Sequence, residues 1–199
     1  MKVLVIQQRY GIGDMLVFSP YLKALSDKTG AKISLLAKQS SKSTDLFSSE
    51  NFLAEVIGLD STNDGILGFF KLLKEIKKKK FDKVFIFNGS IRYRMLAILS
   101  GIKDIHQYPL FTSKDVIFQT AKIFTENYVG KILSTEPHLI IDEKEVEKVR
   151  SSYKLNTNIK NIVLGISASG PTKRWDINNY INLAIKINKF KKCNFFIAA

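Results

Sequence analysis

Short apolar segments alternate with amphipathic segments along the whole chain, and this alternation limits the possible folds more than any other feature of the sequence. Strands that alternate with helices predict a parallel sheet with helices on both of its faces. We expect strands at residues 3–8, 32–37, 55–59, 83–87, 104–107, 161–166 and 194–198, and helices at residues 15–28, 66–79, 91–99, 116–129, 143–153 and 177–189. The predicted fold class is therefore α/β.

A polar stretch rich in Asn, Thr and Lys at residues 155–160 marks the expected domain boundary. We predict a Rossmann-like domain with a parallel sheet at residues 1–157, and the beginning of a second Rossmann-like domain at residues 158–199. A sheet of only two strands would leave its edges uncovered. We therefore expect the second domain to be incomplete and the chain to be truncated at its C-terminal end.

The composition, 45% apolar and 25% charged, is typical of a globular domain with a hydrophobic core. Apolar runs are too short for a membrane span or a signal peptide, so we expect a cytoplasmic protein. Lysines on helix faces carry much of the net charge of +13, without the interleaved arginine and aromatic residues that stack nucleic-acid bases. The charge therefore indicates either a solvated face or attraction to an anionic membrane or substrate, and no nucleic-acid partner is expected.

Neither histidine has a second histidine or a carboxylate at metal-ligand spacing, so no metal site is predicted at His106 or His138. The single cysteine, Cys193, has no neighbouring histidine or acid that would activate its thiol.

The first candidate site is the turn Gly11-Ile12-Gly13-Asp14 after the first strand. Glycines permit a tight turn here, and the start of the next helix offers unpaired N–H groups to a polar ligand. The turn is not GxGxxG and no acidic residue ends the second strand, so a dinucleotide site is disfavoured. Asp14 has two interpretations: it is the N-cap of the helix, or a general base at the carboxyl end of the strand.

The second candidate site is the loop SASGPTKRW at residues 167–175. Its small residues let the backbone approach a phosphate, and Lys173 with Arg174 supplies positive charge for a diphosphate. The alternative is an exposed basic pair. Trp175 is interpreted as a packing residue that anchors the loop.

Two segments together resemble glycosyltransferase family 9, the heptosyltransferases. MKVLVIQQRYGIGDMLVFSPYLKAL is similar to the first strand, GD pair and Ser/Thr-Pro helix of that family, and IVLGISASGPTKRWDINNYINLA is similar to the start of its second domain. The resemblance implies a GT-B architecture. It also implies an inverting, metal-independent transfer of a heptose from an ADP-linked donor to a lipopolysaccharide core acceptor. The donor is then a substrate, and no cofactor is expected.

The same resemblance implies roles for single residues. Asp14 corresponds to the proposed general base, and Lys173 to the lysine that contacts the donor phosphate. The remaining substrate-binding candidates are Gly11, Gly13, Ser169, Thr172 and Arg174.

The sequence also departs from the family pattern. Asp176 stands where the family often has proline, and Ile12 replaces a smaller residue or leucine. A later DxGxxH-type segment has no counterpart in these 199 residues. We therefore expect most of the adenosine pocket to be absent. Two alternatives stay open: the truncated chain is active by itself, or it is inactive unless a separate chain supplies the rest.

A non-catalytic domain that binds an anionic saccharide or a phosphate is the alternative function. Under either function the expected partners are a glycan or a nucleotide sugar, with peripheral contact to the inner membrane.

Overall fold

The computed structural model describes residues 1–198 apart from residues 10, 110–116, 132–133, 157 and 169. The chain forms two compact units, Met1–Ile140 and Ile141–Ala199. Helix α6 (Glu143–Ser152) belongs to the second unit, whereas the boundary predicted from the polar linker lies after this helix. One contact that ties the helix to the second unit is made by Tyr153, whose ring packs edge-on against Phe196 with a centroid distance of 6.0 Å.

The first unit contains a five-stranded parallel sheet. Its strands are β1 (Val3–Gln7), β2 (Ile33–Lys38), β3 (Leu53–Leu59), β4 (Lys83–Ile86) and β5 (Asp104–Gln107), in the spatial order β3-β2-β1-β4-β5. All neighbouring pairs are parallel; for example, Val3 lies beside Ile33 on one side and Lys83 on the other. The prediction of an α/β unit with a parallel sheet is confirmed.

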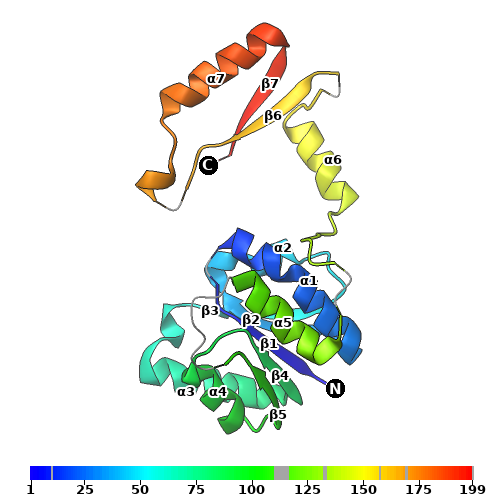
Figure 1. Ribbon diagram of the computed structural model, residues 1–199, viewed down its shortest axis with the longest axis vertical. Coiled ribbons are helices and arrows are strands. Elements are labelled where there is room, and N and C mark those ends of the chain that lie inside the picture. The colour runs from blue at the N-terminus through cyan, green and yellow to red at the C-terminus, as the bar shows by residue number, and fades with distance from the viewer. Residues whose placement is uncertain (10, 110–116, 132–133, 157, 169, 199) are drawn as a thin grey trace. The chain divides into compact units, whose positions relative to one another are not determined.

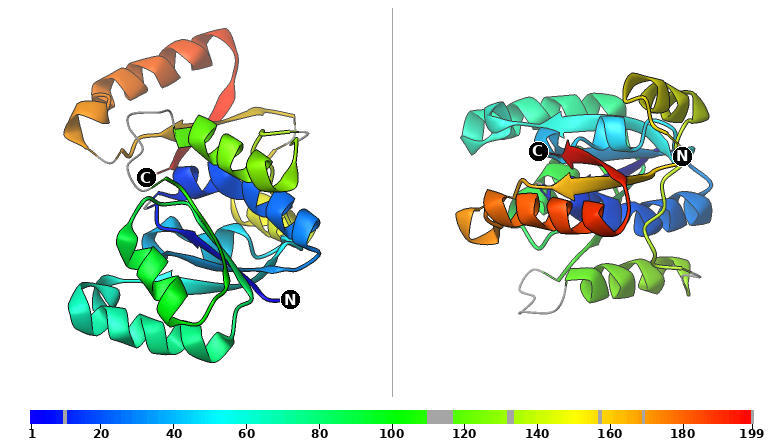
Figure 2. Two further views of the ribbon diagram at one scale, coloured as in Figure 1. Left: turned by 60° about the horizontal axis from the view of Figure 1, so that its bottom comes forward. Right: turned by 90° about the horizontal axis from the view of Figure 1, so that it is seen from above.

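Helices cover both faces of this sheet (Figure 1). One face carries α1 (Ile12–Thr29), α2 (Ser43–Leu46) and α5 (Ile117–Val129), and the other carries α3 (Gly65–Lys79) and α4 (Ile91–Leu99). Short 3-10 turns, η1 (Gln39–Ser41) and η2 (Ser61–Asn63), precede α2 and α3. The two turned views in Figure 2 show the same layering from other sides.

The core is divided by the sheet into two clusters. Side chains of successive strand residues point to opposite faces, so Val3 and Val5 pack under α1 and α5 while Leu4 and Ile6 pack under α3 and α4. All four are at most 1% exposed. Burial of such side chains, worth about 1.5–3 kcal/mol each, explains why the apolar runs predicted the strands correctly.

The direction in which the chain adds strands reverses between β1 and β4. From β1 the chain proceeds outward to β2 and β3, and it then returns across the sheet to β4 and β5. In open parallel sheets, ligands bind outside the carboxyl ends of the strands at such a reversal. The segments that follow β1 and β4 are therefore the place to look for a site.

The second unit has two parallel strands, β6 (Lys160–Gly165) and β7 (Cys193–Ala198), joined by η3 (Pro171–Lys173) and α7 (Ile177–Phe190). This strand–loop–helix–strand order is the predicted beginning of a second Rossmann-like unit. Among its described residues, none is fully buried.

Across the described parts of both units, no helix combines the length and the apolarity that a transmembrane span requires.

Candidate functional site

Asp14 lies in the first turn of α1, at the carboxyl end of β1. The helix begins at Ile12 and its N-cap is Gly11, so the interpretation of Asp14 as the N-cap is wrong. Gly11 can act as the N-cap because its backbone is extended, with φ −92° and ψ 149°, and its carbonyl oxygen accepts the first helical bond from Met15 N at 3.1 Å. The Asp14 carboxylate is exposed and is favoured by the positive end of the helix dipole.

The two glycines of the turn have different surroundings. A Cβ atom at Gly11 would stand 3.3 Å from Asp14 Oδ2, whereas a Cβ atom at Gly13 would meet nothing within 4 Å. Gly11 therefore leaves room for the carboxylate of Asp14. Gly13 leaves open space beside the first turn, where the N–H groups of a helix start are available to a ligand.

The turn between β4 and α4 supplies polar groups at the same edge. Ser90 caps α4, because its Oγ accepts from Arg92 N at 3.2 Å, and Asn88 Oδ1 accepts from Ser90 N at 2.7 Å. Gln107, the last residue of β5, donates from Nε2 to the main-chain oxygens of Asn88 at 2.9 Å and Ser90 at 3.0 Å. The ends of β4 and β5 are thereby held together.

Gln7, the last residue of β1, is buried with an incompletely paired amide. Its side chain is 1% exposed, and its Oε1 accepts from Arg9 N at 3.2 Å. Among the described residues, Nε2 of Gln7 has no hydrogen-bond partner, and neither does Oε1 of Gln107. Buried polar atoms without partners are rare and often indicate a ligand or water.

The carboxyl edge of this sheet thus combines the exposed carboxylate of Asp14, and the carboxylates of Asp60 and Asp64 after β3, with several uncharged amides and hydroxyls. Amides both donate and accept, which suits the hydroxyl groups of a sugar, and a carboxylate can accept the proton of one of them. Asp14, Gly11 and Gly13, which the sequence predicted as site residues, lie at this edge together with Gln7 and Gln107, which it did not predict. The available signal was the position of both glutamines at the carboxyl ends of predicted strands.

The loop of the second unit is braced by its own backbone. Lys173 N donates to Gly170 O at 3.0 Å, and Arg174 Nε donates to Ala168 O at 3.2 Å. The side chains of Thr172, Lys173 and Arg174 are exposed on the same short segment. The predicted residue Ser169 lies outside the described residues. The structure therefore brings together three of the four predicted residues of this loop.

Trp175 and Asp176 join this loop to α7. The indole of Trp175 packs edge-on against Tyr180 at a centroid distance of 5.0 Å, and Tyr180 in turn donates to Gly165 O at 2.9 Å. This contact agrees with the predicted packing role of Trp175. Asp176 is the N-cap of α7 and accepts from Asn178 N at 2.8 Å, which explains how an aspartate serves in the place where the family often has proline.

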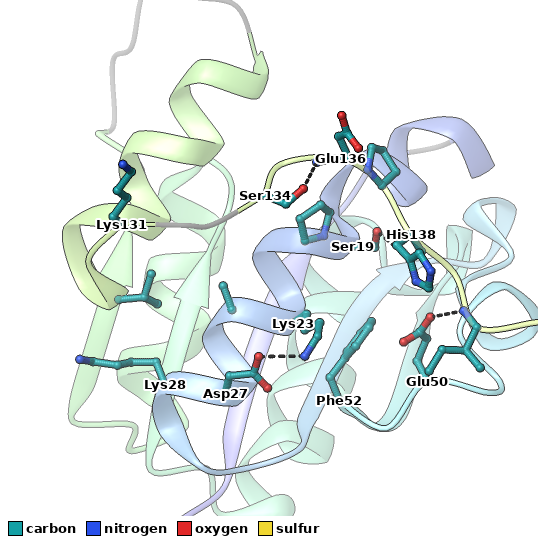
Figure 3. A pocket seen from close by; sticks show the side chains of 15 residues that line it. Ser19, Lys23, Asp27, Lys28, Glu50, Phe52, Lys131, Ser134, Glu136 and His138 are labelled. Atoms are coloured by element: carbon teal, nitrogen blue, oxygen red, sulfur yellow. Dashed lines mark hydrogen bonds and ion pairs between the residues drawn. The ribbon is translucent and has the colours of Figure 1, made fainter.

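A pocket of about 850 Å³ lies on the outer side of α1, away from the carboxyl edge, under the segment at residues 134–140 (Figure 3). The segment is fastened by Ile140 N, which donates to Glu50 Oε1 at 2.7 Å. Within the pocket wall, Lys23 Nζ pairs with Asp27 Oδ2 at 2.9 Å. The sequence does not predict this pocket, because its wall combines α1 with residues more than 100 positions away along the chain.

No group of three or more His, Cys, Asp or Glu side chains with metal-binding geometry occurs among the residues that the structure describes.

No protein-family model and no curated protein matches the sequence. Comparison with solved structures does find proteins of similar fold. ADP-heptose lipopolysaccharide heptosyltransferase II of E. coli superposes with a TM-score of 0.73 at 19% identity, covering 99% of this chain and 64% of that protein. A glycosyltransferase of family 9 from Veillonella parvula DSM 2008 superposes with a TM-score of 0.73 at 17% identity, covering 98% of this chain and 61% of that protein.

The E. coli heptosyltransferase WaaC with ADP-2-deoxy-2-fluoro heptose is a further match, with a TM-score of 0.65 at 13% identity, covering all of this chain and 69% of that protein. The chain spans less than two thirds of the length of the first two proteins. The fold expected from the two sequence motifs, GT-B-like with a Rossmann-like first unit, is thereby confirmed.

Proposed function

We propose that the chain carries the acceptor-side unit and part of the donor-side unit of a glycosyltransferase of family 9, of the heptosyltransferase type. The observation that carries the proposal is the exposed carboxylate of Asp14 on the first turn of α1, at the strand reversal where α/β folds bind ligands. The folds of three sugar transferases, two of them named heptosyltransferases, support the same assignment.

The proposed donor is an ADP-linked heptose or a related sugar. One structural neighbour is described with ADP-2-deoxy-2-fluoro heptose, and another with ADP. In this chain the loop that contains Thr172, Lys173 and Arg174 would bind the diphosphate, with Ser169 as a further contact. Exposed cationic side chains on a backbone-braced loop suit a diphosphate, because charge-assisted bonds to phosphate are strong.

The proposed reaction is a direct, inverting displacement. Asp14 takes the proton of an acceptor hydroxyl while that oxygen attacks the anomeric carbon of the donor sugar. The bond between the anomeric carbon and the diphosphate oxygen breaks, and ADP leaves with the electron pair. Lys173 stabilises the charge that develops on the leaving group. No metal ion and no resident cofactor take part in this scheme.

The proposed acceptor is the core of lipopolysaccharide or a similar glycan. The open space beside Gly13 and the exposed carboxylate of Asp14 suit a hydroxyl-rich ligand, with the buried amides of Gln7 and Gln107 directly behind this edge. A lipid-linked acceptor would bring the protein to the cytoplasmic face of the inner membrane. Nucleic acid is not proposed as a partner.

Titration calorimetry of the chain, and a transfer assay with the rest of the donor-side unit supplied as a separate chain, test the proposal together. ADP-heptose should bind saturably to the full chain, and Lys173→Ala should weaken this binding by about tenfold or more, as expected for loss of a charge-assisted phosphate contact. Asp14→Asn should leave donor binding unchanged and reduce transfer by about a hundredfold or more. Unchanged transfer in Asp14→Asn would remove the general-base assignment. Glycan binding without donor binding would favour the non-catalytic binding domain.

A further inference from the structure

Helix α3 exposes large apolar side chains in its first two turns. Ile66, Leu67 and Phe70 are 76%, 87% and 58% exposed, whereas Leu72 and Ile76 on the sheet side of the same helix are 1% exposed. The three exposed residues are therefore not part of the core. Large apolar side chains that gather on a surface mark a site of interaction with another molecule.

Helix α4 continues this apolar surface. Ile91, Met95, Ile98 and Leu99 are between 47% and 54% exposed. Residues 91 and 95 are four positions apart, and residues 98 and 99 follow three and four positions later, so all four lie on one side of the helix. The opposite side, which includes Leu96, is buried against the sheet.

Arg92 holds the first turns of the two helices side by side. Its guanidinium donates to the main-chain oxygens of Asn63 at 2.5 Å and Gly65 at 3.1 Å, and it lies 5.2 Å from the centre of the Phe69 ring. Both helices cover the same face of the sheet (Figure 1). The exposed apolar residues of α3 and α4 therefore form one continuous surface, which we call the α3–α4 outer face.

Basic side chains accompany this apolar surface along α3. Five lysines lie on α3 and two arginines on α4, and the two helices carry a single acid, Glu75. The exposed apolar residues lie at the start of the solvent side of α3. Four exposed lysines lie farther along the same side: Lys71, Lys74, Lys77 and Lys78. Long lysine side chains can lie along an apolar surface and extend their ammonium groups to a charged layer.

We propose that the α3–α4 outer face docks the protein on an anionic lipid bilayer. Aliphatic side chains flanked by lysines fit the boundary between acyl chains and anionic headgroups, where burial of apolar area and electrostatic attraction both contribute. A protein partner would have to match both this apolar area and an excess of positive charge, whereas an anionic bilayer offers both features at once.

The position of this face agrees with the proposed function, on which its biological role rests. Helices α3 and α4 begin at the carboxyl edge of the sheet, as α1 does with Asp14. Docking through the first turns of α3 and α4 would bring the carboxyl edge of the sheet toward the lipid, while α1 with Asp14 lies on the other face of the sheet. The glycan of a lipid-linked acceptor would therefore have to extend past the sheet edge to reach Asp14.

Vesicle co-sedimentation of the full chain tests the proposal, with neither donor nor acceptor present. The wild type should bind vesicles that contain phosphatidylglycerol and bind pure phosphatidylcholine vesicles at least tenfold more weakly. Leu67→Ser combined with Phe70→Ser should weaken binding to the anionic vesicles by about tenfold or more. The matched control is Ile123→Ser on α5, which is 59% exposed on the opposite side of the sheet and should have no effect.

A second pair of variants tests whether electrostatic attraction contributes to vesicle binding. Lys74→Gln combined with Lys78→Gln should weaken binding by roughly 25-fold, since each basic residue near an anionic surface contributes about fivefold. The control, Lys28→Gln combined with Lys32→Gln, removes the same charge outside α3 and α4 and should change binding less than twofold.

Three outcomes would overturn the proposal: no vesicle binding by the wild type, equal binding to neutral and anionic vesicles, or equal loss in the control variants. A concentration-dependent dimer that Leu67→Ser and Phe70→Ser abolish, without vesicle binding, would assign the face to self-association instead. None of these results depends on transfer, so the vesicle assay can fail while the proposed transferase function holds.

Discussion

The carboxylate of Asp14 lies over Gly11, so that a Cβ atom at residue 11 would stand 3.3 Å from Asp14 Oδ2. This distance is shorter than ordinary van der Waals contact, and the neighbouring carboxylate would have to move by a few tenths of an ångström. The position of the proposed general base therefore depends on the absence of a side chain at residue 11. The backbone conformation of Gly11 does not itself require glycine, because its φ is negative.

Gly11→Ala is expected to lower transfer by about tenfold and to destabilise the protein by about 0.5–1 kcal/mol. The first effect follows from displacement of the Asp14 carboxylate, and the second from the poor N-capping of alanine. Transfer kinetics and thermal denaturation measure the two effects. Transfer at the wild-type rate would show that the carboxylate does not need its present position.

Gly13→Ala is expected to stabilise the protein against unfolding and to weaken its binding of the acceptor. A Cβ atom at residue 13 meets nothing within 4 Å, and alanine in a helix is favoured over glycine by roughly 0.5–1 kcal/mol. If the acceptor occupies the open space beside Gly13, the KM for the acceptor rises while the melting temperature also rises. A higher melting temperature with an unchanged KM would place the acceptor elsewhere.

Gln7→Leu separates stability from ligand binding at the carboxyl edge. The substitution removes a buried donor that has no partner among the described residues, but also the Oε1 that accepts from Arg9 N, so the free energy of unfolding should change by less than about 1 kcal/mol. Acceptor affinity should fall by roughly three- to tenfold only if binding exposes the buried Nε2 to an acceptor hydroxyl. Urea denaturation and acceptor titration provide the measurements. Destabilisation by 2 kcal/mol or more, an order of magnitude typical of a broken buried network, would show that Nε2 already has a partner inside the protein.

The strands and helices could be predicted from the sequence because their apolar periodicity coincides with burial. The strand expected at residues 104–107 matches β5, and the run at residues 3–8 matches β1 apart from its last residue. The short helix α2 was missed because its sequence, STDL, has no helical periodicity of its own. Its position is fixed by the buried Phe47 that follows it.

Residues of the candidate site could be predicted only where a reactive side chain stands next to a recognisable strand or turn in the sequence. Asp14 follows a strand and a glycine, and this pattern gave its place at the sheet edge but not its place within the helix. Burial of the Gln7 amide depends on neighbours from other strands and helices, which the sequence does not place. The α3–α4 outer face could not be predicted from the sequence either, because apolar residues such as Ile66, Leu67 and Phe70 are equally typical of a core segment.

The pH dependence of stability is expected to depend on Asp104. Its carboxylate contacts Lys83 Nζ at 2.5 Å and His106 Nε2 at 2.8 Å. The hydrogen bond from Lys83 lowers the pKa of Asp104 below its usual value, although partial burial opposes the shift and His106 adds to it. Since the folded pKa is lower than the unfolded pKa of about 3.9, this carboxylate stabilises the protein above that pH, and the contribution is lost as the pH falls through the folded pKa.

Asp104→Asn should therefore cost about 1 kcal/mol of unfolding free energy at pH 7, a modest value because the carboxylate is half exposed and screened by solvent. The difference from the wild type should shrink as the pH is lowered and vanish once the pH is below the folded pKa of Asp104. Chemical denaturation across this pH range gives the result. The control is Glu145→Gln, whose exposed pair with Lys148 at 3.6 Å should contribute almost nothing at any pH. A pH-independent difference for Asp104→Asn would show that its effect is not electrostatic.

Gly68→Ala is expected to be the most destabilising of these substitutions. A Cβ atom at Gly68 would stand 2.3 Å from the main-chain carbon of Asn63 and 2.6 Å from the main-chain oxygen of Thr62. These are backbone atoms that cannot rotate away, so α3 must shift, at a cost of about 3 kcal/mol. Gly13→Ala is the matched control, because it introduces the same methyl group into a helix with open space around it. Because Asn63 also accepts the bond from Arg92 that joins α3 to α4, Gly68→Ala should weaken binding to anionic vesicles at temperatures where the protein is still folded. Unchanged stability in urea denaturation would contradict the close packing of α3 on η2.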